Sequence, residues 1–154
     1  MSSISVKRVT LEGADVVFDL VDQLLRELGE EGDESGTLDR GGLTRAWRSD
    51  EARQFAFVAF DGDAPAGVAT VAEAFAIYAN GHYGIINEMY VAPGYRSGGV
   101  GGLLVDAVKA LGRERGWRRV DVTAPESERW ARTRRFYERN GFRFTGPKLK
   151  SLLS

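Results

Sequence analysis

The chain has 154 residues, of which 43% are hydrophobic and 28% charged, and its formal net charge is −1. This length suits one domain spanning 1–154 with a buried core, and the chain has no apolar run long enough to cross a membrane. The absence of cysteine excludes disulfides and thiol nucleophiles, and the single His82 leaves too few soft ligands for a zinc site. The first residues lack the apolar core of a secretory signal, so we expect a cytoplasmic protein without a metal.

Charge is distributed unevenly along the chain. Residues 1–80 contain 7 Lys and Arg against 15 Asp and Glu, whereas residues 81–154 contain 14 against 7. A basic half suits a polyanionic ligand, and an acidic half suits a cationic one. The alternative is a solvated surface with an accidental bias.

The first half of the chain predicts a strand, two helices and an antiparallel strand pair. Ile4–Thr10 has strand character, and the apolar spacing within 14–28 predicts a helix. A weaker helix is predicted over Leu38–Ser49. Two segments rich in strand-forming residues, Phe55–Phe60 and Ala66–Tyr78, flank the turn signal Asp61-Gly62-Asp63, so they predict a hairpin.

The second half predicts alternating strands and helices. Strands are expected at Tyr83–Val91 and Arg119–Thr123, and helices from about Val100 to Arg115 and over Glu128–Asn140. Two final strands are expected at Phe142–Thr145 and Lys148–Leu152. The strand-helix-strand order predicts parallel neighbours here, inside a sheet that is antiparallel in its first half. The fold class is therefore mixed α/β, with six to seven strands and about four helices.

A glycine-rich segment follows the strand that ends at Val91. Its sequence is Arg96-Ser97-Gly98-Gly99-Val100-Gly101-Gly102, and it opens a predicted amphipathic helix. Glycine lets the backbone turn with its N–H groups pointing one way, and the helix N-terminus adds partial positive charge. The segment therefore predicts an anion cradle. A tight strand-to-helix turn with no ligand is the alternative.

Two motifs together resemble the GNAT superfamily of N-acyltransferases. The pattern Arg-x-x-Gly-x-Gly after Tyr90-Val91-Ala92-Pro93 resembles that family's acetyl-CoA motif, and 136–142, Phe-Tyr-Glu-Arg-Asn-Gly-Phe, resembles its helix-ending motif. The resemblance extends over nearly the whole chain. It implies a GNAT-like twisted sheet that is splayed between its fourth and fifth strands, with a β-bulge that we place at Asn87-Glu88.

The resemblance also implies how acetyl-CoA would be held. Backbone N–H groups of Ser97, Gly98, Gly99, Val100, Gly101 and Gly102 would hold the pyrophosphate, with Arg96 beside it. Backbone groups of Met89, Tyr90 and Val91 would pair with the pantetheine arm like an added strand. Thr123, at the end of the facing strand, joins the cofactor-binding set. Many relatives carry an asparagine where this chain has Trp130, so that contact does not transfer.

The resemblance gives Tyr137 the role of general acid, which would protonate the leaving thiolate; packing in the core is the alternative. Glu88 is the candidate base, because it is the only acid between His82 and the glycine segment. A carboxylate bonded to nearby backbone is the alternative, and some relatives use water. For the amine, we consider Glu31 and Glu34 in an acidic loop, together with Tyr78, His82 and Tyr83 around a turn.

The predicted function is direct acetyl transfer from acetyl-CoA to a primary amine, with a small cationic amine preferred over a protein N-terminus or lysine. One alternative is a non-catalytic acyl-CoA-binding or sensing module. A nucleic-acid-binding protein ranks last, because the arginines of the second half lack interleaved aromatics. No nucleic-acid or membrane partner is expected, and the final strand is a candidate surface for a homodimer.

Overall fold

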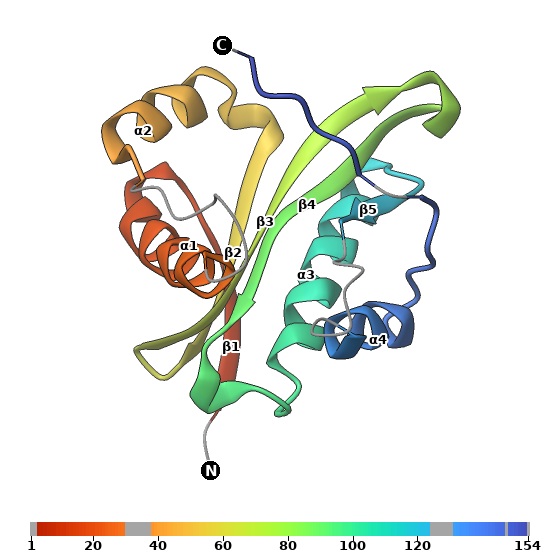
Figure 1. Ribbon diagram of the computed structural model, residues 1–154. Coiled ribbons are helices and arrows are strands. Elements are labelled where there is room, and N and C mark those ends of the chain that lie inside the picture. Colours follow the sequence, from red (N-terminus) through yellow and green to blue (C-terminus); the bar gives the residue numbers. More distant parts are fainter. Residues whose placement is uncertain (1–2, 30–37, 124–130, 147, 154) are drawn as a thin grey trace.

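The computed structural model describes residues 3–29, 38–123, 131–146 and 148–153. Its helices and strands, in chain order, are β1 (Ile4–Val9), α1 (Ala14–Leu28), α2 (Arg40–Ser49), β2 (Gln54–Asp61), β3 (Ala64–Ala76), β4 (Gly81–Val91), α3 (Val100–Arg115), β5 (Val120–Val122) and α4 (Ala131–Arg139). The strands form one sheet in the order β1-β2-β3-β4-β5. Helices α1 and α2 cover one face of this sheet, and α3 and α4 lie on the other (Figure 1).

The mixed character of the sheet is confirmed. Strands β1 to β4 pair antiparallel, and β4 pairs parallel with β5. The hairpin predicted at Asp61-Gly62-Asp63 is present, with Gly62 at a φ of +61°. A non-glycine side chain is strained at such a positive φ, which explains the glycine in this turn.

The predicted six to seven strands are not confirmed, because the described residues form five. The stretches expected to be the last two strands, Phe142–Thr145 and Lys148–Leu152, are described without strand structure. Alternating side chains favour an extended chain, but a strand also needs a neighbouring backbone to receive its hydrogen bonds. The tail of the chain has no such neighbour within the described residues.

Each face of the sheet contributes a separate hydrophobic core. On the α1 side, Val17, Leu20 and Val21 of the helix pack against Val58 and Val68 of the sheet. On the other side, Val100, Leu104 and Val108 of α3 pack against a set drawn from β2, β3 and β4, namely Phe55, Phe57, Ala69, Val71 and Ile86. The apolar spacing that predicted both helices therefore identifies their buried faces.

Trp117 connects the C-terminal end of α3 to the sheet. A Cβ built on Gly84 of β4 would lie 2.4 Å from its ring, and a Cβ on Gly112 of α3 would lie 2.8 Å from it. Both glycines are thus explained by the close approach of one indole. The indole N–H donates to the carboxylate of Glu73 at 2.6 Å, which also accepts from the guanidinium of Arg115.

Candidate active site

The central feature of the site is a stretch of β4 that has no strand partner on one edge. Thr70 pairs with Glu88 and Val71 with Ile86, so Asn87 is an extra residue in β4, and the predicted bulge is confirmed. Strand β5 pairs only with Gly84, Ile85 and Ile86. Within the described residues, the backbone of β4 beyond the bulge is therefore unpaired on the β5 side, as the splay requires.

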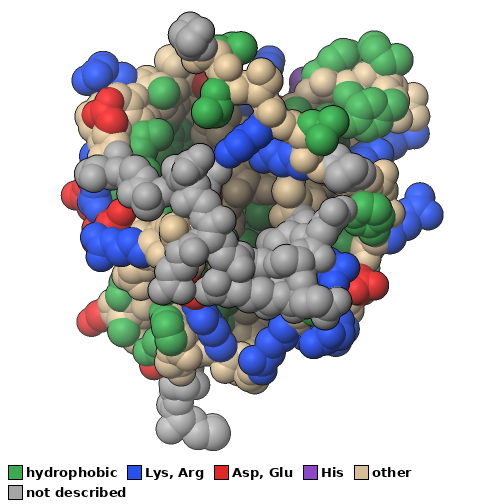
Figure 2. Space-filling model, in the orientation of Figure 1, with side chains coloured by type: hydrophobic (Ala, Val, Ile, Leu, Met, Phe, Trp, Pro, Cys, Tyr) green, Lys and Arg blue, Asp and Glu red, His purple; other side chains and the backbone are tan. Residues whose placement is uncertain are grey.

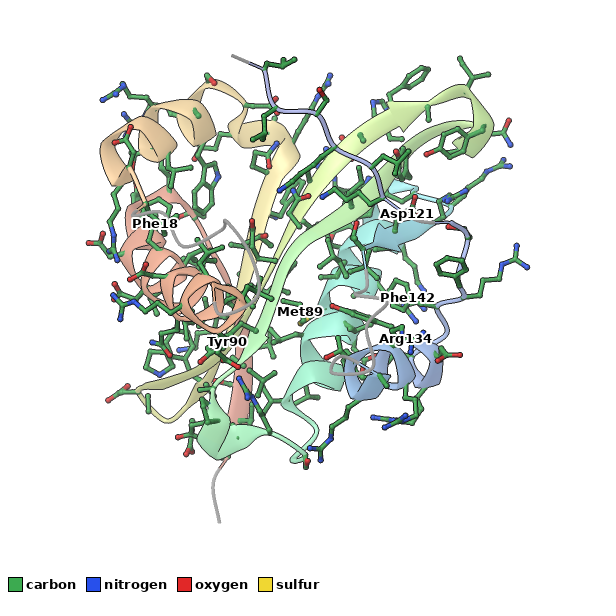
Figure 3. All side chains as sticks on the ribbon, in the orientation of Figure 1. Phe18, Met89, Tyr90, Asp121, Arg134 and Phe142 are labelled. Atoms are coloured by element: carbon green, nitrogen blue, oxygen red, sulfur yellow. The ribbon has the colours of Figure 1, made fainter. Side chains whose placement is uncertain are left out.

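The side chains of this open stretch alternate between the two cores. Met89 packs with the α3 cluster, whereas Tyr90 is 5% exposed and packs against α1 (Figure 3). The Tyr90 hydroxyl donates to Gln23 at 3.3 Å, and burial is the main cause that raises its pKa. Only the backbone of these two residues is thus presented to the seam.

The glycine segment forms a left-handed turn at the start of α3. Ser97 and Gly99 have positive φ values of 69° and 86°, and Gly99 is the N-cap of the helix without a capping side chain. The first N–H groups of α3 therefore have no partner within the helix. They lie at the end of β4 farthest from β5, which fits an anion bound at the predicted cradle.

Not every glycine in this segment serves the cradle. A Cβ on Gly101 would lie 2.9 Å from the ring of Phe136, so this glycine permits the close packing of α4 on α3. By contrast, a Cβ on Gly99 would meet no atom within 4 Å. Gly99 is required by its backbone conformation and leaves open space in front of the helix.

Arg96, immediately before the glycine turn, bonds to the end of β4 and to α1. Its Nε donates to the carbonyl of Val91 at 2.8 Å, its Nη2 pairs with Glu27 of α1 at 2.6 Å, and its guanidinium lies over the Tyr90 ring. The carbonyl of Val91 is therefore already occupied, although the sequence placed it with the pantetheine arm. Arg96 joins α1 to the end of β4.

A different arginine reaches the glycine segment. Arg132 of α4 donates from Nη2 to the hydroxyl of Ser97 at 3.1 Å. The sequence indicates that one or more arginines of residues 129–135 could meet the CoA phosphates, but a run of arginines on a predicted helix gives no signal for the one that faces the cradle. Only the packing of α4 on α3, set by Gly101 and Phe136, identifies it.

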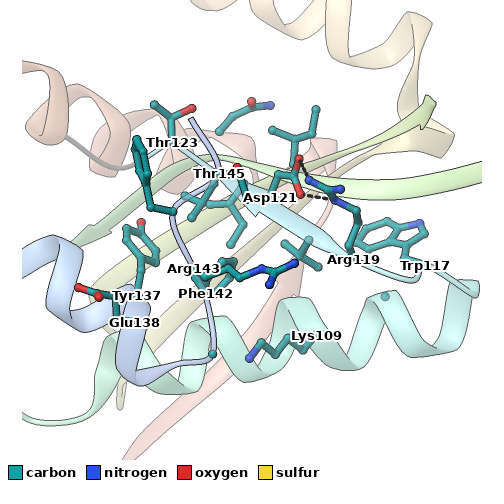
Figure 4. A pocket seen from close by; sticks show the side chains of 18 of the residues that line it. Lys109, Trp117, Arg119, Asp121, Thr123, Tyr137, Glu138, Phe142, Arg143 and Thr145 are labelled. Carbon is teal, nitrogen blue, oxygen red and sulfur yellow. Dashed lines mark hydrogen bonds and ion pairs between the residues drawn. The ribbon is translucent and has the colours of Figure 1, made fainter. Parts of the chain in front are cut away.

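Tyr137 lies on α4, packed against Phe136 and Phe142. Its side chain is 6% exposed, and burial raises its pKa to about 12. It lines a cavity of about 1390 Å³ that is also lined by Asn87 of the bulge and by Thr123 at the end of β5 (Figure 4). A phenol in this position keeps its proton at neutral pH and can act as a donor.

Glu88 follows the bulge directly but is oriented differently from Asn87. Its carboxylate accepts from the hydroxyl of Thr70, and the backbone N–H of Glu88 donates to the same hydroxyl oxygen at 3.0 Å. Glu88 is half-buried, has no basic partner among the described residues, and does not line the cavity that contains Tyr137. The structure thus places the candidate acid and base on either side of the bulge.

The three candidate residues around the turn between β3 and β4 make two separate sets of contacts. Tyr78 donates to the hydroxyl of Tyr83 at 3.1 Å, and Arg119, the residue before β5, lies over both rings. His82 is exposed and packs edge-on against Phe75. Asn87 lies five residue steps along β4 from His82, which is about 16 Å, so His82 does not reach the open stretch. Glu31, Glu34 and Trp130 lie outside the described residues.

The face shown in Figure 2 carries Lys and Arg side chains over both halves of the chain. Lys and Arg side chains gather over α4 and the start of α3, where Arg132, Arg135 and Arg139 are exposed.

Among the described residues, no group of His, Cys, Asp and Glu is arranged to hold a metal ion, and no helix is long and apolar enough to cross a membrane.

Residues 18–142 match the model of the acetyltransferase (GNAT) family. No curated protein sequence is detectably similar to the chain. Solved structures share the fold. An aminoglycoside acetyltransferase from an uncultured soil metagenomic sample superposes with a TM-score of 0.84 at 18% identity, covering 99% of both chains.

Two further solved structures contain a bound ligand. A predicted acetyltransferase from Clostridium acetobutylicum, solved with acetyl-CoA, has a TM-score of 0.76 at 17% identity, covering 97% of this chain and 96% of that one. AAC(6')-Iy, in complex with the bisubstrate analogue CoA-S-monomethyl-acetylneamine, has a TM-score of 0.77 at 18% identity, covering 99% of both chains. At these identities the superpositions establish the shared fold.

Proposed function

Because the chain belongs to the GNAT acetyltransferase family and uses acetyl-CoA as donor, we propose that it passes the acetyl group directly to a primary amine at the bulge in β4. One observation carries this proposal. The unpaired stretch of β4 connects the glycine turn at the start of α3 to the cavity that Tyr137 and Asn87 line. A cofactor with a pyrophosphate at one end and a thioester at the other fits that path.

Different residues of the chain would bind the pyrophosphate and the pantetheine arm of acetyl-CoA. The free N–H groups at the start of α3 and the guanidinium of Arg132 would hold the pyrophosphate. Backbone groups of Met89 and Tyr90 would pair with the pantetheine amides. Acetyl-CoA supplies an acetyl group activated as a thioester.

The transfer itself needs two proton movements. The amine nitrogen forms a bond to the acetyl carbon as the C–S bond breaks, so the amine must lose a proton and the sulfur must gain one. We assign removal of the amine proton to Glu88, directly or through water, and protonation of the sulfur to Tyr137. The raised pKa of Tyr137 keeps its proton available at neutral pH.

For the acceptor we propose a small cationic amine. Helix α1 carries several acids, but these are matched by arginines, with Asp19 paired to Arg40 and Glu27 to Arg96. Glu88 lacks a basic partner in the described part of the chain, so it is available to an ammonium group. Three of the similar structures are of aminoglycoside acetyltransferases, which agrees with this class.

The proposal is tested by release of CoA thiol from acetyl-CoA over grouped amines, including small polyamines, aminoglycosides and peptides with a free N-terminus. Tyr137→Phe should lower kcat at least tenfold and leave CoA affinity unchanged, whereas the matched control Tyr95→Phe should keep its activity. Full activity of Tyr137→Phe at every pH would show that the acid is another group. Thermal stabilisation by CoA with no turnover on any amine would favour a sensing module.

Glu88 is tested through turnover. Glu88→Gln should lower kcat/KM and leave CoA affinity unchanged, while Glu51→Gln, which changes an exposed acid in the turn before β2, should leave kcat/KM as it is. If Glu88→Gln keeps the wild-type kcat/KM, water or another group removes the proton.

We also propose a homodimer. Leu149, Leu152 and Leu153 near the end of the chain are 84–95% exposed, and a second copy offers the same apolar surface to cover them. Sedimentation at micromolar concentration should give a dimer that Leu149→Asp with Leu152→Asp converts to a monomer. A wild-type monomer would contradict this proposal. The cytoplasmic location stays a prediction.

A further inference from the structure

The cavity beside β5 has a composition that the transfer of acetyl to a cationic amine does not explain. Its walls are the paired part of β4, strand β5, the C-terminal half of α3, helix α4 and the first residues of the tail. We call it the β5 cavity. Figure 4 shows Lys109 on α3 and the Arg119–Asp121 pair at the start of β5 on opposite sides of it.

The lining of the β5 cavity is strongly basic. Seven lining side chains are Lys or Arg and two are Asp or Glu, and the basic ones are Lys109, Arg113, Arg118, Arg119, Arg134, Arg143 and Lys148. One of the acids, Asp121, accepts two hydrogen bonds of 2.7 and 3.0 Å from Arg119. The negative charge of Asp121 is therefore neutralised by Arg119. The other, Glu138, is exposed.

Most of these cations have no counter-charge in the described part of the chain. Arg113, Arg118, Arg143 and Lys148 make no ion pair there. The Nε of Arg134 is buried without a hydrogen-bond partner. Like charges gathered around one hollow repel each other, and a buried N–H without an acceptor is unfavourable. A bound anion would relieve both.

The β5 cavity is separate from the pyrophosphate cradle. None of the residues from Ser97 to Gly102 lines it. Lys109 and Arg113 lie about 12 and 18 Å along α3 from Gly101, at a rise of about 1.5 Å per residue. A pyrophosphate held at the start of the helix therefore cannot neutralise them.

We propose that the β5 cavity is a second anion site, which binds a small molecule through its carboxylate or phosphate groups. Guanidinium groups from several elements suit the planar, forked geometry of such anions. Because Tyr137 and Asn87 also line the cavity, the anion lies next to the reaction centre. It is either an acid group of the acceptor itself or a separate molecule bound beside the acceptor. Only the relation of the anion to the acceptor rests on the proposed function; the anion site itself does not.

Binding is tested first, without turnover. Citrate and inorganic phosphate are titrated by calorimetry into protein saturated with CoA, so that the cradle is already filled. We expect saturable binding that weakens as salt is raised. In the variant Arg143→Gln with Lys148→Gln, whose side chains are exposed and outside both cores, affinity should fall at least tenfold. Arg48→Gln with Arg45→Gln on α2 removes the same charge elsewhere and should bind like wild type.

Matched acceptors then separate the two sources of the anion. Glucosamine 6-phosphate is compared with glucosamine, and lysine with cadaverine, by thiol release. A preference for the acid-bearing amine that disappears in the double variant assigns the site to the acceptor. Binding of phosphate without competition from any amine assigns it to a separate anion. Absence of saturable citrate or phosphate binding to the CoA-saturated protein overturns the proposal, and it does so whether or not the protein acetylates an amine.

Discussion

Removing the charge of Glu73 should destabilise the protein in a way that depends on pH. Its carboxylate, on β3, accepts from Arg115 Nε at 2.6 Å, from Arg115 Nη2 at 3.0 Å and from the indole of Trp117 at 2.6 Å. The side chain of Glu73 is 8% exposed. Glu73→Gln keeps the size of the side chain but removes the charge that holds the end of α3 against the sheet.

The expected magnitude follows from the pKa. The hydrogen bonds from Arg115 lower the pKa of Glu73 from 4.5 to about 2, with a further contribution from Trp117 and against the effect of burial. A shift of this size corresponds to about 3 kcal/mol of folding stability at pH 7 as an upper bound. Because Arg115 is 35% exposed and solvent weakens the pair, we expect about 1–2 kcal/mol.

The stabilisation by Glu73 should depend on pH in one direction only. The folded-state pKa is depressed, so the stabilisation is fully present above pH 4.5 and is lost as the pH falls toward 2. Urea denaturation of wild type and Glu73→Gln should show the full difference at pH 7 and a smaller one at pH 3. An equal difference at both pH values, or none at pH 7, would refute the reasoning. Glu51→Gln serves as the exposed control.

Three further predictions concern the site. The stability of wild type should fall between pH 10 and about 12 more steeply than that of Tyr137→Phe, because the folded state holds the Tyr137 proton that the unfolded chain releases. Gly101→Ala should lower the free energy of unfolding by about 1–3 kcal/mol through a clash with Phe136. Arg132→Gln should weaken CoA binding several-fold and reduce its dependence on salt.

Each of these has a matched control. Tyr95→Phe should reduce the slope at high pH less than Tyr137→Phe does, because the pKa of Tyr95 is raised mainly by its hydrogen bond to Asp61 rather than by burial. Gly94→Ala, where a Cβ meets no atom within 4 Å, should cost far less than Gly101→Ala. Arg139→Gln, at the far end of α4, should leave CoA affinity nearly unchanged. If a variant and its control have equal effects, the contact that we assign to the variant residue does not cause the effect.

The sequence by itself determined the four helices, the first five strands and the family. Apolar spacing located the buried faces of α1 and α3, because a helix must bury one face wherever it packs. The glycine segment and the Phe136-Tyr137 motif pointed to acetyl-CoA, and the bulge at Asn87-Glu88 was predicted correctly. These features depend on local backbone geometry and short-range patterns, which a linear sequence records.

Only the tertiary structure decided which charged side chains meet. Arg96 donates hydrogen bonds to Glu27 and to the carbonyl of Val91, while Arg132, distant in sequence, donates to Ser97. The predicted last strands also depended on a neighbour that the described tail does not have. An arginine side chain has the same local pattern wherever it points, and a strand exists only when another backbone pairs with it. Both are properties of contacts between remote segments, so the sequence pattern alone does not fix them.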